Sequence, residues 1–148
     1  EMKQITTNFN RYETKYLITE KQMQLIINNL YEKIISDEYG KSTICNLYYD
    51  TPDYLLIRRS CERPEYKEKL RLRSYGVANA NSPVFAEIKK KYDGVVYKRR
   101  IKSNELSAML LLKGNTKAAE DSQIKREIDF FVKRYEKLEP KVFISYAS

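Results

Sequence analysis

Two stretches rich in basic residues decide the fold: residues 66–75 read YKEKLRLRSY, and residues 83–102 read PVFAEIKKKYDGVVYKRRIK. The first stretch alternates charged and apolar side chains, which is the pattern of a β-strand with two different faces. The second contains Asp93-Gly94, a dipeptide that favours a two-residue hairpin turn. We therefore predict three antiparallel strands, over 66–75, 83–92 and 95–102.

The alternation in the first strand separates its cations from its leucines. Because every second side chain shares a face, Lys67, Lys69, Arg71 and Arg73 lie on one side, and Leu70 and Leu72 lie on the other. An ordinary solvated outer face would give the same pattern. The alternation alone therefore leaves two interpretations open, a solvated surface and an anion-binding face.

The hairpin turn sharpens the choice between these interpretations. Counting outward from the turn predicts these opposite pairs: Tyr92 with Val95, Lys89 with Lys98, Ile88 with Arg99, and Glu87 with Arg100. Two like charges directly opposite each other destabilise a sheet by up to about 1 kcal/mol. The Lys89–Lys98 pair therefore favours an anion between the two side chains, although two lysines splayed into water remain an alternative.

The net charge of +8 is concentrated in the same region. Residues 63–102 hold 12 Lys and Arg against four Asp and Glu, so they carry the whole excess. One local site for a polyanion is the expected consequence. The chain has no GxxxxGK[ST] loop and no histidine, which excludes a backbone phosphate cradle of that type, a Cys–His nucleophile pair and histidine metal sites. Side chains must therefore bind the anion, and the planar forks of Arg71 and Arg73 suit phosphate oxygens.

The remaining sequence predicts an α+β fold with an antiparallel sheet and a single domain over residues 1–148. The further elements are a strand over 9–18, a helix over 20–35 with a capping box from Thr19, a strand over 42–50, a short helix to Ser60 after Thr51-Pro52-Asp53, a helix from the Ser103 cap to Gly114, a polar loop over 115–121, a helix from Ser122 that Pro140 breaks, and a strand over 141–146. No apolar run is long enough to span a membrane. Two lone cysteines in a chain of this size indicate a reducing, cytoplasmic compartment.

Five motifs, taken together, resemble the VTC-type polyphosphate polymerase domain of the triphosphate tunnel metalloenzyme superfamily, over residues 9–148. In family order they are Arg11–Tyr16, Leu47–Thr51, Lys69–Gly76 with its R-x-R pair, Phe85–Lys89 with an E-x-K pattern, and the basic strand Val96–Arg100. The resemblance implies a barrel-like tunnel of antiparallel strands, flanked by helices, that holds a phosphate chain. Since domains of this family continue further, it also implies that this chain is the N-terminal part of one and leaves an open sheet edge that favours self-association.

The resemblance implies an enzyme that transfers the terminal phosphoryl group of ATP to polyphosphate. The implied phosphate-binding residues are Lys15, Lys69, Arg71, Arg73, Lys89, Lys98 and Arg100, among which Arg71, Arg73 and Lys89 would be catalytic. It also implies a divalent cation, Mn²⁺ or Mg²⁺, with Glu13 and Glu87 as candidate metal-side or orienting carboxylates. An alternative for Glu87 is a salt bridge to Arg100.

Three other functions remain open from the sequence. Triphosphate hydrolases of the same superfamily usually carry E-x-E-x-K in the first strand, whereas this chain has Arg11 and Glu13 before Lys15, which favours the polymerase. A nucleic-acid binder would use some of the 13 tyrosines for stacking, but neither an RNP-like motif nor a basic helix is present. The third alternative is a polyphosphate-binding module without catalysis.

Overall fold

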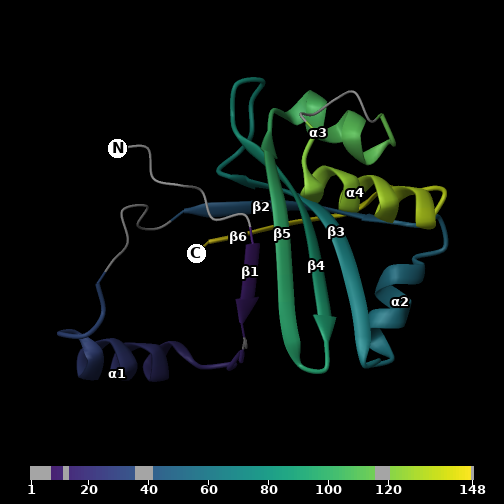
Figure 1. The fold of residues 1–148 in the computed structure, drawn as a ribbon. Coiled ribbons are helices and arrows are strands. Elements are labelled where there is room, and N and C mark those ends of the chain that lie inside the picture. Colours follow the sequence, from purple (N-terminus) through teal and green to yellow (C-terminus); the bar gives the residue numbers. More distant parts are fainter. Residues whose placement is uncertain (1–7, 12–13, 36–41, 116–120, 148) are drawn as a thin grey trace.

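The computed structural model describes residues 8–11, 14–35, 42–115 and 121–147, and its centre is a six-stranded antiparallel sheet (Figure 1). The strand order is β1 (Asn8–Arg11), β5 (Val95–Ser103), β4 (Val84–Tyr92), β3 (Tyr66–Tyr75), β2 (Thr43–Asp50) and β6 (Glu139–Ala147). The sheet is strongly twisted: in Figure 1, β2 and β6 run nearly horizontally, whereas β3, β4 and β5 run nearly vertically. The predicted α+β class with an antiparallel sheet is confirmed.

The β4–β5 hairpin has the predicted register. Asp93 and Gly94 both have positive φ angles, 44° and 78°, as a two-residue hairpin turn of this class requires. The paired residues are Lys89 with Lys98, Ile88 with Arg99, and Glu87 with Arg100. The β3–β4 pairing then adds Arg71 opposite Glu87 and Lys69 opposite Lys89. Local turn chemistry therefore placed these side chains on the expected faces of the sheet.

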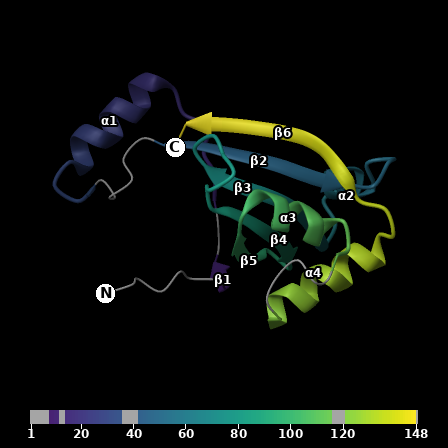
Figure 2. The ribbon, with the colours of Figure 1, turned by 90° about the horizontal axis from the view of Figure 1, so that it is seen from above.

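Three helices cover one face of the sheet, and none of the other elements that the structure describes is a helix on the opposite face. The three helices are α2 (Leu55–Cys61), α3 (Glu105–Leu112) and α4 (Gln123–Arg134), and Figure 2 shows α3 and α4 on the same side of the strands. The core between them contains fully buried side chains from both layers, among them Leu70, Ile88, Leu111, Leu112 and Ile128. Each such side chain contributes about 1.5–3 kcal/mol through burial. The leucines of β3 thus face helices, which leaves the cations of β3 on the uncovered face.

The N-terminal elements are shorter than predicted. The first strand ends at Arg11 rather than at residue 18, and α1 spans Glu20–Leu30 rather than 20–35. The capping box of Thr19 is present, with Gln22 N–H donating to the Thr19 hydroxyl at 3.3 Å. None of the α1 residues is buried, and α1 lies apart from the sheet and from the other helices in both views (Figures 1 and 2). Apolar periodicity predicted this helix, but it did not predict where its apolar side packs.

Two predicted boundaries in the C-terminal half are wrong. Asn104, not Ser103, caps α3, because its Oδ1 accepts the Ser107 N–H at 2.8 Å while Ser103 still belongs to β5. Helix α4 begins after Ser122, as predicted, but ends at Arg134, well before Pro140. Pro140 is instead the second residue of β6, beside a register shift between Tyr48 and Tyr49 of β2. A proline is tolerated there because β6 lies at the edge of the sheet.

The β6 edge carries apolar side chains that solvent reaches. Phe143 is 64% exposed, and Val142 and Ile144 are also exposed. Exposed, flat and apolar edges favour pairing with another chain, so self-association through β6 stays a prediction. Among the helices that the structure describes, none is long and apolar enough to cross a membrane.

Candidate functional site

The uncovered face of β3, β4 and β5 collects nearly all of the cations that the sequence pattern singled out. The registers place ten charged side chains on it, and we call this set the basic face: Lys67, Lys69, Arg71, Arg73, Glu87, Lys89, Lys91, Lys98, Arg100 and Lys102. Nine of these are cations, and Glu87 is their carboxylate. Such an arrangement attracts anions, because the field of each cation adds to that of the others.

Glu87 is the centre of the basic face. Its side chain is fully buried, and its Oε2 accepts a hydrogen bond from Arg71 Nε at 2.8 Å and lies 2.8 Å from Arg71 Nη2. Arg73 Nε lies 3.8 Å from the same oxygen. Lys98 Nζ lies 3.2 Å from Oε1, an ion-pair distance without the angles of a hydrogen bond. One carboxylate therefore holds cations from β3 and β5 in a fixed arrangement.

The charges of this cluster are coupled. Burial alone would raise the pKa of Glu87, but Arg71, Lys98 and Arg73 outweigh it and hold that pKa below its ordinary value. Burial acts to lower the pKa of Arg71, yet Glu87 and Tyr48 raise it overall. For Lys98, burial lowers the pKa by more than Glu87 raises it. Glu87 is therefore ionised at neutral pH and balances only part of the charge around it.

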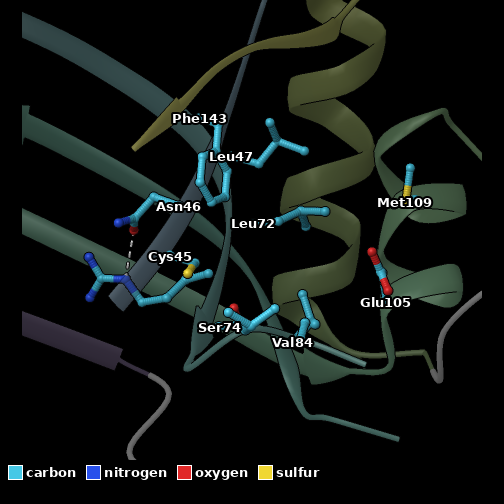
Figure 3. A pocket seen from close by; sticks show the side chains of 12 residues that line it. Cys45, Asn46, Leu47, Leu72, Ser74, Val84, Glu105, Met109 and Phe143 are labelled. Carbon is cyan, nitrogen blue, oxygen red and sulfur yellow. Dashed lines mark hydrogen bonds between the residues drawn. The ribbon is translucent and has the colours of Figure 1, made fainter. Parts of the chain in front are cut away.

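Two residues of β2 orient the arginines, and the sequence had not singled them out. Asn46 is buried; its Oδ1 accepts a hydrogen bond from Arg73 Nε at 2.9 Å (dashed line in Figure 3). The Tyr48 hydroxyl accepts one from Arg71 Nη1 at 3.0 Å, and the tyrosine ring lies 5.7 Å from the guanidinium carbon. The signal that could have found them is their parity, because both lie on the uncovered face of a strand that pairs with β3.

The other predicted residues lie in three different settings. Lys69, Lys89 and Arg100 are half-buried on the basic face. Lys15 lies outside the sheet, in the exposed segment between β1 and α1. Glu13 lies outside the described residues. The structure thus brings together all of the predicted phosphate-binding residues except Lys15, whose part in such a site remains a prediction.

A cavity of about 330 Å³ lies mainly on the opposite, helix-covered side (Figure 3). Its walls include Leu47, Leu72 and Val84 from the sheet and Met109 from α3. Most of this lining is apolar, and its two charged residues are Arg73 and the acidic Glu105, so the cavity does not offer the row of cations that a phosphate chain requires. We therefore assign the candidate site to the open basic face and not to this cavity.

The described residues do not fit a directly bound divalent cation. Both oxygens of Glu87 face cations, at 2.8 Å and 3.2 Å, so a metal ion there would meet strong repulsion. Among the residues that the structure places, no group of three His, Cys, Asp or Glu side chains is arranged to hold a metal. Glu87 therefore suits the orienting role that the resemblance offered as its other option.

Removing one hydroxyl tests whether β2 orients the basic face. We expect Tyr48→Phe to weaken the binding of inorganic triphosphate about tenfold, because the charged Arg71 guanidinium loses a hydrogen bond of about 1.5 kcal/mol while the ring is kept. Isothermal titration calorimetry would measure this change. Tyr66→Phe is the control, since its hydroxyl donates to Glu68 at 2.6 Å on the helix-covered face. Equal losses in the two variants would contradict an orienting role for Tyr48.

The fold and the family agree with comparisons to known proteins. The most similar structures include a "putative adenylate cyclase" from Bacillus halodurans, with a TM-score of 0.54 and 14% identity, covering 97% of this chain and 64% of that chain. A protein of the same description from Vibrio parahaemolyticus gives a TM-score of 0.40, 12% identity, and coverage of 97% and 62%. A Hippeastrum adenylyl cyclase homologue, described as having a dominant triphosphatase activity, gives 0.43, 16%, and coverage of 94% and 60%. The first similarity shows the fold alone.

The chain spans less than two thirds of the length of each of these structures. No curated protein matches the sequence. A family model for the VTC domain, in contrast, matches residues 10–147. This match includes every strand of the basic face and both residues of β2 that orient its arginines. Since it covers nearly the whole sequence, the chain belongs to the VTC domain family, as its motifs predicted.

Proposed function

We propose that the basic face binds a phosphate chain and that the complete protein transfers the terminal phosphoryl group of ATP to polyphosphate. The observation that carries this proposal is the cluster around Glu87, which holds Arg71, Arg73 and Lys98 within 3.8 Å of one buried carboxylate. A linear polyanion matches such a row of cations, because each phosphate unit can meet a different side chain. Phosphate, ATP and polyphosphate are therefore the proposed ligands.

The chain's own residues supply positioning and charge for the transfer. A terminal oxygen of the polyphosphate attacks the γ-phosphorus of ATP, the bond to the β,γ-bridging oxygen breaks, and ADP leaves. This reaction needs in-line geometry and neutralised oxygens more than a protein nucleophile. In our proposal, Arg71 and Arg73 bind the transferred group with their planar forks, and Lys89 and Lys98 bind the adjacent phosphates. A divalent cation, Mn²⁺ or Mg²⁺, would add charge neutralisation when bound with ATP.

The test of the proposed activity is a product analysis. The complete protein is incubated with ATP and Mn²⁺, and long-chain polyphosphate and ADP are measured together by gel electrophoresis and chromatography. We expect both products to accumulate together, because each transfer yields one ADP and lengthens the chain by one unit. Release of free phosphate from triphosphate without any polymer would favour the hydrolase instead.

Salt dependence separates a phosphate site from other binding. We expect the affinity for triphosphate to fall steadily as ionic strength rises, since contacts between exposed charges are screened over about 10 Å at 0.1 M salt. Titrations at several salt concentrations would measure the slope. A site without catalysis would show the same slope but no polymer. A strong preference for single-stranded nucleic acid over triphosphate would instead support the nucleic-acid binder.

A further inference from the structure

The basic face has two chemically different ends. From Arg71, β3 runs four residues to Tyr75 in one direction and four residues to Lys67 in the other. At about 3.3 Å per residue, each end lies about 13 Å from Arg71 along the strand. The aromatic side chains of Tyr75 and Phe85 stand at one end, together with Arg100 and Lys102, and four lysines stand at the other end: Lys67, Lys69, Lys89 and Lys91. This asymmetry gives the proposed phosphate site a direction.

The aromatic end presents rings beside the arginines. Tyr75 is 50% exposed and packs edge-on against Phe85, with 5.8 Å between ring centroids. Arg100 Nη1 donates to the Tyr75 hydroxyl at 3.3 Å, and its guanidinium carbon lies 4.7 Å from the Phe85 ring centroid. Tyr146 is also exposed, at 45%. The rings of Tyr75 and Tyr146 are therefore accessible to a ligand rather than part of the core.

Tyr146 completes this end from the edge strand. In the register, buried Ile44 of β2 lies between Tyr75 and Tyr146, so the two tyrosines stand two strands apart. That separation is about 10 Å between backbones, and the side chain of Ile44 lies on the same face between the two tyrosines. Arg73 Nη2 also donates to the Tyr146 hydroxyl, at 3.4 Å. Both exposed tyrosines are therefore joined to cations of the proposed phosphate site.

The lysine end places like charges opposite one another. Lys67 pairs with Lys91, Lys69 with Lys89, and Lys89 with Lys98 across adjacent strands. Like charges directly opposite one another repel, so a polyanion bound across these pairs would reduce the repulsion. Lysines act as point charges without the directional fork of arginine, so they hold successive phosphates with little demand on geometry. This end thus suits a chain of variable length.

We propose that the aromatic end binds the nucleobase of the donor and that the lysine end binds the distal phosphates of the growing chain. The inference rests on the proposed function and adds the orientation of its two substrates. Stacking suits the first task, because every base has a π-face that an exposed tyrosine can cover. The arginines between the two ends then contact the phosphates between which the transfer occurs.

The aromatic end is tested by comparing ATP with inorganic triphosphate. Binding is measured by calorimetry on the complete protein without added divalent cation, so that no turnover interferes. We expect Tyr75→Leu to weaken ATP binding about tenfold more than triphosphate binding, because both ligands lose the Tyr75 hydroxyl that contacts Arg100 but only ATP carries a base. Tyr75→Phe keeps the ring and should therefore retain the preference for ATP over triphosphate. Tyr92→Leu is the matched control, since Tyr92 is 51% exposed but lies at the hairpin turn.

The lysine end is tested with long polyphosphate against triphosphate. We expect Lys91→Gln to weaken the binding of long chains about threefold to fivefold at low salt, which corresponds to the loss of one close charge contact. Triphosphate and ATP should bind as before, because they do not reach this end. Lys90→Gln removes the same charge from the adjacent position on the opposite face and should have no effect on either ligand.

These two experiments also separate the orientation from the proposed activity. If Tyr75→Leu weakened triphosphate as much as ATP, or if Lys91→Gln weakened triphosphate as much as long chains, the orientation would be overturned. The orientation would also be overturned if single-stranded nucleic acid competed with ATP for the site at Tyr75 more strongly than free nucleotides did. Because both experiments measure binding constants, their results test the orientation even if product analysis finds no polymer.

Discussion

Arg71→Lys is expected to lower the rate of polyphosphate synthesis about a hundredfold, the usual cost of removing one preorganised donor to the reacting group. Three nitrogens of the Arg71 guanidinium face Glu87 and Tyr48, at 2.8, 2.8 and 3.0 Å. Its two terminal nitrogens each keep a second N–H, so the held guanidinium can still donate to phosphate oxygens. A lysine keeps the charge, but it lacks the planar guanidinium that can donate hydrogen bonds to Glu87 and to a phosphate at the same time. Steady-state measurement of ADP release would give the rate.

The matched control for this substitution lies on the other face of the sheet. Arg99 pairs with Ile88 in the register, and its Nη1 lies 3.1 Å from Glu127 Oε1 of α4. Arg99→Lys removes the same guanidinium chemistry away from the basic face and should leave the rate nearly unchanged. Normal synthesis in Arg71→Lys together with loss of synthesis in Arg99→Lys would show that the assigned face is wrong.

Glu87→Gln is expected to lower the free energy of unfolding by about 3–5 kcal/mol, because it leaves buried cations without their carboxylate. Urea denaturation would measure the loss. Inorganic triphosphate should stabilise this variant more than the wild type, since the ligand supplies the missing negative charge. Glu127→Gln is the control: its ion pair with Arg99 is half-exposed, so its loss should cost at most about 1 kcal/mol. Equal destabilisation in the two variants would contradict the central position of Glu87.

The same residue predicts how stability depends on pH. The pKa of Glu87 is lowered in the folded state by the neighbouring cations, which outweigh the effect of burial, so its ionised form favours folding. This stabilisation is fully present above the ordinary pKa of 4.5 and is lost progressively as pH falls below 4.5 through the lowered folded value. Glu87→Gln lacks this ionisable group, so it has no such stabilisation to lose. The free energies of unfolding of the variant and the wild type should therefore converge at acid pH. Denaturation curves recorded from pH 7 to acid would detect this convergence.

Much of the basic face could be predicted from local sequence. The alternation in YKEKLRLRSY predicted the strand Tyr66–Tyr75 with its bounds, and Asp93-Gly94 predicted every pair of the hairpin. Both follow from short-range geometry: side chains alternate along a strand, and a two-residue turn allows a single register. Parity then assigned Arg71 and Arg73 to one face before any tertiary contact was known.

The tertiary structure decided which partners those cations meet. The hairpin register places Arg100 opposite Glu87, and the structure adds ion pairs of Glu87 with Arg71, Arg73 and Lys98. Arg71 and Arg73 reach Glu87 from β3, and Lys98 reaches it from β5, because β4 lies between these two strands. The length of each side chain then determines whether it reaches the carboxylate. Register determines which residues are opposite one another, but burial and side-chain length select among neighbours.

The orienting residues of β2 were beyond local prediction for a similar reason. Asn46 and Tyr48 meet Arg73 and Arg71 because β2 joins the sheet next to β3, although they are 27 and 23 residues apart in sequence. The sequence by itself determined the elements, the hairpin register and the concentration of charge. The order of strands, the partners of Glu87 and the isolated position of α1 came only from the tertiary structure, because they depend on burial shared between distant segments rather than on local backbone geometry.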